Sequence, residues 1–212
     1  MKLHSCKAGF TLAEVLMTMT IVGVVAAMTI PTLHYQRVKK EYSAKLKNFY
    51  SRMDNAILDM QMDKGSFKDM KLPSSDAEAF GWYMDNIDPY FGHQFVSNNK
   101  IYFKDGSAIV GISKGGCIDV VYDVNGEKSP DRPGFDRFRY LLCFSDGQRL
   151  NYFGNSDVFF GTYGSGLNNA SRQEMIRKCS GQGEGNENGA HWCTKLLQND
   201  QWEFKSDYPH KF

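Results

Sequence analysis

The feature that most constrains this chain is an uncharged apolar segment near its amino terminus. From Val15 to Leu33 the sequence contains no charged side chain. At about 1.5 Å rise per residue, a helix over this segment has roughly the length of a 30 Å hydrocarbon core, so it can span a membrane. A single acid, Glu14, stands directly before the segment. Because an unpaired carboxylate at membrane depth costs at least about 2.5 kcal/mol, Glu14 needs a partner.

A short basic leader, residues 1–9, precedes the apolar segment and ends in Ala8–Gly9. A secretory signal peptide is cut at a small-residue site after its apolar region, whereas here the small residues come before it. The order of basic leader, Gly9, Phe10, Glu14 and uncharged helix resembles the amino terminus of type IV prepilins. This class includes the pseudopilins of type II secretion.

The resemblance implies a processing pathway. In that family the leader is removed between the residues that match Gly9 and Phe10, and the new amino terminus is N-methylated. The apolar helix, residues 10–33, is then retained as an anchor. Two alternatives are an ordinary signal anchor and a secretory signal cut near Val25–Ala27. Both explain the length of the apolar segment, but neither gives Glu14 a role.

The position of Glu14 suggests how subunits would assemble. Cleavage before Phe10 would create an α-amino cation in or at the edge of the membrane, close to the Glu14 carboxylate. In a staggered bundle of helices, Glu14 of one subunit can face the Phe10 amine of its neighbour, which neutralises both charges and sets the axial register. In the resembling family this acid is needed for assembly. Pro31 is expected to kink the helix, because its ring removes one hydrogen bond and clashes with the preceding turn.

Composition adds little that is specific. The chain carries 25 Lys and Arg against 24 Asp and Glu, and loss of the two leader lysines leaves 23 against 24. Such a near-neutral chain does not indicate nucleic-acid binding. The sequence therefore divides into a leader (1–9), a membrane and assembly helix (10–33) and one exported domain (34–212), which is long enough to form its own core.

A helical apolar period continues beyond Pro31. It ends near Lys64–Gly65, where glycine can take the left-handed conformation that closes a helix. The expected apolar positions are Tyr35, Val38, Tyr42, Leu46, Phe49, Met53, Ala56 or Ile57, and Met60. We therefore expect one long helix, apolar in its first half and amphipathic in its second.

From Lys100 onward apolar residues recur at every second position, which predicts β-strands. Asp105–Gly106 and Asp146–Gly147 are turn signals between neighbouring strands. Strands are expected at 100–104, 107–113, 118–123, 138–144 and 148–153, helices at 76–85, 171–179 and 192–198, and a Gly/Asn-rich connection at 161–169. The predicted fold class is α+β, with the long amino-terminal helix packed on an antiparallel β-meander, a pilin-like arrangement.

Cysteine usage indicates the compartment. Cys6 would leave with the leader, and the even number that remains suits an oxidising space. Cys179 and Cys193 bound a glycine-rich loop, 180–190, and a disulfide closing it would contribute about 3 kcal/mol. Positive residues occur on both sides of the apolar helix, so charge alone does not orient it. The cysteines favour an inner-membrane anchor with the carboxy-terminal domain outside the cytoplasm, at the cell surface if it joins a filament.

The register of the third and fourth strands suggests a second disulfide. If Asp123 lies opposite Phe138, Cys117 comes beside Cys143, within the distance that a disulfide requires. The sequence alone does not fix how the four cysteines pair.

One loop offers oxygen ligands. Asp123, Asn125, Asp131 and Asp136 surround a glycine turn, and calcium prefers such ligands. The spacing is not that of an EF-hand. The alternative is an Asx-rich turn whose carboxylates cap their own backbone. Calcium is therefore a candidate ligand, and no cofactor is required.

Catalytic motifs are absent from the sequence. The histidines form no His-Glu-x-x-His pair and no Gly-x-Ser-x-Gly elbow is present, although Cys179, His191 and Cys193 could in principle ligate a metal. The resemblance implies a structural subunit of a pilus or pseudopilus. Its implied partners are a prepilin peptidase, an assembly platform protein and other pilins. The alternative is a membrane-tethered binding protein or enzyme that does not polymerise.

Overall fold

The computed structural model describes residues 9–126, 128–164, 167–181 and 192–212. The chain divides into two compact units, Met1–Lys39 and Lys40–Phe212. Helix α1 (Leu12–Lys64) contributes to both. The predicted leader lies outside the described residues except for Gly9.

The amphipathic half of α1 was predicted correctly. The helix ends at Lys64, and Gly65 follows with a φ of +94°. Its buried residues are Tyr42, Leu46, Phe49, Met53, Ala56, Ile57 and Met60. Two expected core positions are not buried: Tyr35 is 49% exposed and Val38 is half-buried. Both residues lie before Lys40, where the second unit begins. The helical spacing of apolar residues therefore starts earlier in the chain than the part of α1 that packs on the sheet.

Pro31 lies inside α1, and the helix continues past it. A proline within a helix leaves the carbonyl one turn earlier without its usual N–H donor. The predicted kink at Pro31 stays a prediction.

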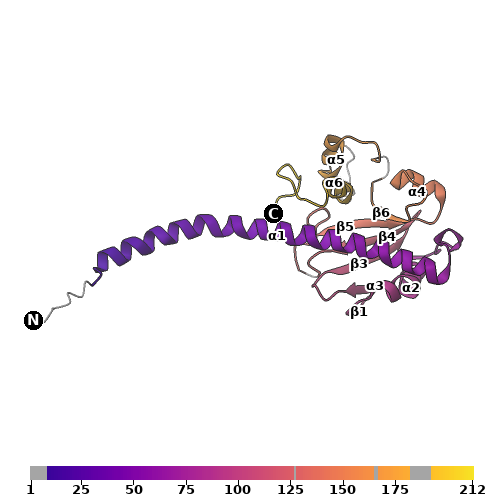
Figure 1. Cartoon of the computed structure of the whole chain (residues 1–212), viewed down its shortest axis with the longest axis horizontal. Coiled ribbons are helices and arrows are strands. Elements are labelled where there is room, and N and C mark those ends of the chain that lie inside the picture. The colour runs from indigo at the N-terminus through magenta and orange to yellow at the C-terminus, as the bar shows by residue number, and fades with distance from the viewer. Residues whose placement is uncertain (1–8, 127, 165–166, 182–191) are drawn as a thin grey trace, which may run out of the picture. The chain divides into compact units, whose positions relative to one another are not determined.

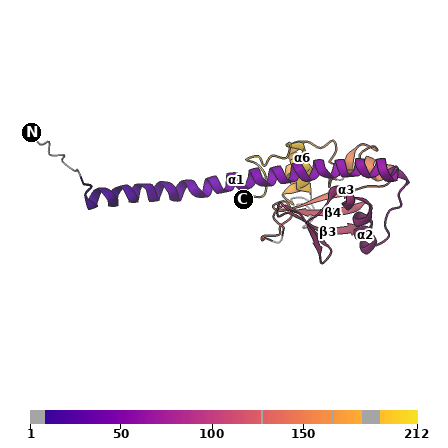
Figure 2. The same cartoon turned by 60° about the horizontal axis from the view of Figure 1, so that its bottom comes forward.

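The second unit is built on one six-stranded sheet, and its strands follow one another in chain order with every neighbouring pair antiparallel. The strands are β1 (Phe95–Ser97), β2 (Lys100–Tyr102), β3 (Ala108–Lys114), β4 (Ile118–Asp123), β5 (Arg137–Leu142) and β6 (Phe160–Thr162). The amphipathic half of α1 crosses one face of this sheet (Figures 1 and 2). The predicted α+β meander is confirmed.

The remaining helices surround the sheet. They are η1 (Phe67–Asp69), α2 (Asp76–Asn86), α3 (Asp88–Phe91), α4 (Asp146–Phe153), α5 (Arg172–Cys179) and α6 (Cys193–Asn199). Helices α2, α5 and α6 match the predicted ones to within a residue or two. Helices α2 and α5 begin at serine caps, Ser75 and Ser171, whose hydroxyls each accept a backbone N–H from the first turn. Most of the predicted loop 180–190 lies outside the described residues.

Aromatic rings join α1 to the sheet. Phe49 is 2% exposed, and its ring stacks on that of Tyr122 at a centroid distance of 4.0 Å. The same ring contacts Tyr140 on β5 and Phe91 at the end of α3, at 5.1 and 5.5 Å. This side chain therefore ties the helix to β4, β5 and the segment before β1.

The predicted register of β4 and β5 was wrong by one residue. Asp123 lies opposite Arg137, not Phe138. A slip of one residue moves every side chain of a strand to the other face. The observed register instead pairs Asp123 with Arg137 as ions, with 2.9 Å between Oδ2 and Nε. It also continues to Ile118 opposite Leu142, which brings the adjoining Cys117 and Cys143 together.

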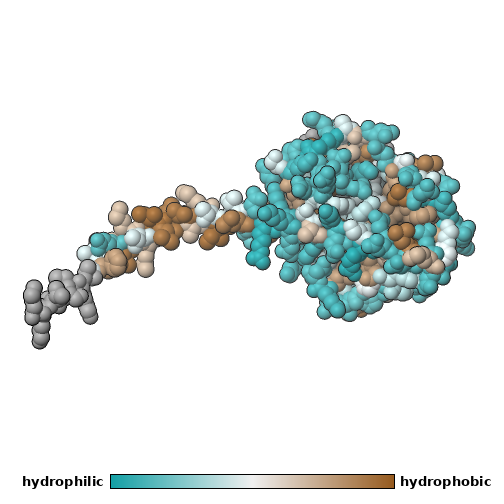
Figure 3. Space-filling model, in the orientation of Figure 1, coloured by the Kyte–Doolittle hydropathy of each residue, from teal (hydrophilic) through white to brown (hydrophobic). Residues whose placement is uncertain are grey.

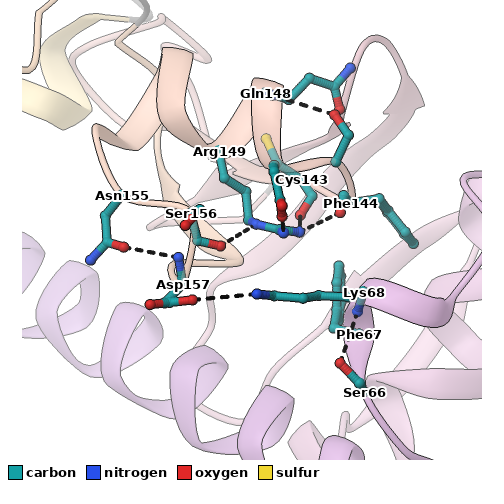
Figure 4. A network of polar contacts seen from close by, with 12 residues as sticks. Ser66, Phe67, Lys68, Cys143, Phe144, Gln148, Arg149, Asn155, Ser156 and Asp157 are labelled. Carbon is teal, nitrogen blue, oxygen red and sulfur yellow. Dashed lines mark hydrogen bonds and ion pairs between the residues drawn. The ribbon is translucent and has the colours of Figure 1, made fainter.

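The strand predicted at 148–153 is a helix, α4. Ser145 caps it by accepting the backbone N–H of Gln148, and Gly154 ends it in the left-handed conformation. Asp146–Gly147 is thus the first turn of a helix, not a hairpin. The helix buries Arg149, whose guanidinium donates to the backbone oxygens of Phe144 and Ser156 (Figure 4).

Two strands were missed. Strand β1 pairs with β2 through a turn at Asn98 and Asn99, which have φ values of 51° and 57°. Two consecutive left-handed residues form the tight turn that matches strand twist, and asparagine tolerates this conformation. Strand β6 occupies the start of the stretch predicted as a connection, at Phe160–Thr162, and pairs with β5.

We expect Phe49→Ala to lower the free energy of unfolding by about 3–5 kcal/mol, because it opens a cavity between helix and sheet. Urea denaturation of the detergent-solubilised chain measures this loss. Leu58→Ala is the matched control: Leu58 is 57% exposed on the same helix, and its truncation should change stability by about 0.5 kcal/mol or less. Equal losses in the two variants would contradict the assignment of Phe49 to the core.

Candidate functional site

The amino-terminal candidate site begins just before α1. Gly9 and Phe10 have no regular secondary structure, and Phe10 is 90% exposed. The peptide bond between them therefore lies in an accessible, non-helical stretch, the conformation in which a peptidase can bind a chain. Cleavage there would leave Phe10 two residues before the first residue of the helix, Leu12.

Glu14 has a role within its own chain that the sequence analysis missed. Its Oε2 accepts hydrogen bonds from the backbone N–H and the hydroxyl of Thr11, at 2.8 and 2.7 Å. The Thr11 hydroxyl in turn accepts the backbone N–H of Glu14 at 3.2 Å. This is a reciprocal capping box, and the pattern Thr-x-x-Glu before an apolar run is its sequence signature. The cap supplies donors to the carboxylate but no positive charge.

The apolar half of α1 exposes its side chains within the first unit. Met17, Val22, Met28 and Leu33 are each 66–73% exposed, and apolar residues cover this part of the helix (Figure 3). An 18-residue window has a mean hydropathy of 1.9, and by length and composition the helix can cross a membrane. A helix that is apolar all round is suited to lipid or to the packing of other helices. The segment therefore fits a membrane anchor.

Two disulfides join the four cysteines of the second unit. Cys117–Cys143 links the ends of β4 and β5, and Cys179–Cys193 links the end of α5 to the start of α6. The Cα atoms are 4.4 and 4.5 Å apart, and all four residues are buried. The structure thus contains both pairs that the sequence suggested.

The oxygen-rich loop brings its acids together but surrounds them with donors. Asp123 and Asp136 are fully buried. Asp123 accepts the Nε–H of Arg137 at 2.9 Å and the backbone N–H of Asn125 at 3.1 Å. Asp136 accepts the backbone N–H groups of Asp131 and Arg132 at 3.0 and 2.6 Å. These bonds are the ones expected of an Asx-rich turn that caps its own backbone.

Burial dominates the electrostatics of this loop. It raises the pKa of Asp123 to about 6, although the hydrogen bond from Arg137 acts in the opposite direction. Burial also raises the pKa of Asp136. Asn125 turns its amide towards Tyr42 on α1, donating to the phenol oxygen at 3.1 Å, and Asp131 pairs with Arg137 at 2.8 Å. The loop therefore fastens β4 and β5 to the helix.

A different cluster meets the distance requirement for a metal. Among the described residues, Cys179, Cys193 and His210 form the one group of three or more His, Cys, Asp or Glu residues whose ligand atoms lie within 4.8 Å of one another. The two sulfurs are already bonded to each other, so they are not free as thiolate ligands. His191, which the sequence placed beside this pair, lies outside the described residues.

Comparison with known proteins gives two matches. Residues 32–212 match a family described as "Family of unknown function (DUF6613)". Residues 4–30 match the prokaryotic N-terminal methylation motif, which confirms the resemblance to type IV prepilins for this part of the chain. No curated protein and no solved structure matches the chain.

We expect chelation with EDTA to leave the melting temperature of the detergent-solubilised chain unchanged, because N–H donors already occupy the buried carboxylates of Asp123 and Asp136. Thermal unfolding followed by circular dichroism, with calcium and with magnesium as the control, measures this. A stabilisation by calcium that is lost in Asp131→Asn would instead show that the loop binds the ion, because a ligand that binds only the folded state raises its stability.

Proposed function

Because the chain belongs to a family of unknown function and begins with a prepilin-type methylation motif, we propose that it is a structural subunit of a type IV pilus or of a type II secretion pseudopilus. It is cut after Gly9, anchored by residues 10–33 and polymerised through its amino-terminal helix. It is not an enzyme; a prepilin peptidase carries out the bond cleavage on it. The motif at residues 4–30 is the observation that carries this proposal.

The assembly mechanism follows from the charges at the start of α1. Cleavage leaves an ammonium group on Phe10, and Glu14 supplies a carboxylate about one helical turn later. Thr11 donates to that carboxylate in its own chain, but it adds no positive charge. A neighbouring subunit whose Phe10 amine reaches Glu14 neutralises both groups in a medium where isolated charges are costly.

The second unit supports a location outside the cytoplasm. Its two buried disulfides suit an oxidising compartment. We propose a single-pass protein of a bacterial inner membrane whose carboxy-terminal domain is exported and displayed on a filament. Its partners would be the prepilin peptidase, an assembly platform protein and other pilins or pseudopilins.

The first test is the amino terminus of the protein extracted from membranes of cells with a working prepilin peptidase. We expect a chain that starts at Phe10 and carries a methyl group on its α-amine, measured by intact mass and amino-terminal sequencing. A Gly9→Val variant should remain uncut, because the bulky side chain blocks the site. A wild-type chain that starts at Met1 or near Ala27 would contradict the proposal.

The second test concerns assembly. We expect Glu14→Leu to leave the chain processed and membrane-bound but to reduce its incorporation into filaments to background, because the Phe10 amine loses its counter-charge. Immunoblots of sheared filaments and membrane fractions measure both. Thr20→Leu is the control, since Thr20 is uncharged and its hydroxyl donates to the backbone oxygen of Leu16 in its own helix. A tethered protein that never polymerises would work equally well with Leu at position 14.

A further inference from the structure

Helix α1 carries an acid, Asp54, that has no partner among the described residues of the second unit. Asp54 is half-buried, and no described residue forms a hydrogen bond or ion pair with its carboxylate. It lines a hollow of about 250 Å³, here called the Asp54 hollow. The hollow is also lined by Tyr50, Ile57, Leu58, Val158 and Phe159. Burial raises the pKa of Asp54 to about 6.

The Asp54 hollow is shaped for a cation on an apolar stem. Buried carboxylates are normally paired. A half-buried acid without a partner therefore indicates that the partner comes from outside the chain. The walls are mostly aliphatic and aromatic, and Leu58 beside the acid is 57% exposed. A lysine side chain combines an aliphatic stem with a charged tip, and it matches both properties.

The segment that contributes Asp157, Val158 and Phe159 to the hollow is held in place by the buried Arg149. Its guanidinium donates to the backbone oxygen of Ser156 (Figure 4). The guanidinium also lies over the Phe159 ring, at 4.6 Å from the ring centroid. The other acid of the hollow, Asp157, already has a cation, because Lys68 lies 3.4 Å from its Oδ1. Asp54 is therefore the acid that remains available in a preformed site.

The opposite edge of the sheet carries the complementary charge. A hollow of about 340 Å³, here called the Lys104 hollow, is lined by Asn48, Arg52, Phe91, His93, Phe103 and Lys104, together with Asp105. Asp105 is engaged by Ser107, which donates to it through its backbone N–H and its hydroxyl.

His93 in this second hollow contacts the Asp88 carboxylate at 2.8 Å, whereas its Arg and Lys side chains contact no carboxylate of the described residues. Arg52 donates to the Phe91 carbonyl at 2.7 Å and lies over the Phe91 ring. In the described part of the chain, neither Arg52 nor Lys104 pairs with an acid. Lys104 is exposed and lies in the turn between β2 and β3, so its ammonium is free to reach a neighbour.

The two hollows lie on opposite sides of one unit. The Asp54 hollow borders β6, the Lys104 hollow lies near β1 and β2, and β1 and β6 are the two edge strands of the sheet. Helix α1 lines both, through Asp54 on one flank and Arg52 on the other. A contact that joins different patches of identical subunits leaves one of each patch free, so it can repeat along a filament.

We propose that Lys104 of a second copy of this chain enters the Asp54 hollow and pairs with the Asp54 carboxylate. The contact is head-to-tail, with the β1 edge of one copy against the β6 edge of the next. It rests on the proposed role as a filament subunit and adds to it a contact between exported domains, separate from the pairing of Glu14.

Charge exchange tests this contact in cells that form the filament. Asp54→Lys and Lys104→Asp should each lower incorporation by about tenfold or more, since each places like charges together. The variant that carries both changes should recover to within about twofold of wild type, because the pair is restored with opposite polarity. Asp59→Lys combined with Lys114→Asp is the control; both side chains are exposed and line neither hollow.

The outcomes separate the two proposals. Wild-type levels in both single variants, or no recovery in the double variant, would overturn the contact while leaving the role in a filament intact. Absence of the wild-type chain from filaments would overturn both. Processing after Gly9 should be the same in every variant, and this is measured on the same samples.

A stability measurement distinguishes a docking residue from a structural one. Asp54→Asn removes an unpaired charge from an apolar site, so at pH 7 the melting temperature of the detergent-solubilised chain should stay the same or rise by a few degrees. Incorporation into filaments should nevertheless fall. A lower melting temperature would show that Asp54 serves the fold, and would overturn its assignment to the contact.

Discussion

The packing of one helix face on the sheet is the interaction on which the second unit depends. Phe49 contacts rings on β4 and β5 and at the end of α3, so a single side chain joins segments far apart in the sequence. The seven buried residues of α1 begin at Tyr42, after a long run of exposed apolar residues. The same helix thus carries two apolar patterns. One is covered by the sheet, and the other is exposed in the described part of the first unit. The second pattern calls for lipid or for other helices.

Sequence periodicity predicted those parts of the fold that local chemistry determines. The amphipathic half of α1 and the serine-capped helices α2 and α5 were found because both the period and the caps are local. The failures occurred where two local interpretations compete. Asp146–Gly147 is a hairpin signal, but Ser145 and Gln148 also form a helix-capping pattern, and the burial of Arg149 in a helix decides between them. The register of β4 and β5 is decided by the pair Asp123–Arg137 and by a disulfide, and both become visible only in three dimensions.

The sequence named residues for the candidate site at the amino terminus, but it did not predict the contacts between them. Gly9, Phe10 and Glu14 lie within the stretch that matches the methylation motif, and their roles stay predictions. The hydrogen bonds from Thr11 to Glu14 were not predicted, because the acid was taken to be unpaired. The capping box lowers the cost of burying the carboxylate by giving it two donors, while its net charge remains. A carboxylate that is oriented by its own chain, and that has no counter-charge among the described residues, is well prepared to bind an amine from a neighbour.

The near-neutral net charge of the chain explains why specific contacts between copies would matter more than the long-range electrostatic force between them. Without its leader lysines the chain carries 23 basic and 24 acidic side chains, so copies neither repel nor attract one another strongly at a distance. Association must then depend on places where charge is locally uncompensated. The second unit offers an acid in the Asp54 hollow and cations in the Lys104 hollow, at opposite edges of one sheet. An unpaired, half-buried acid destabilises an isolated domain, so its presence is easiest to understand if the missing charge arrives with the next subunit.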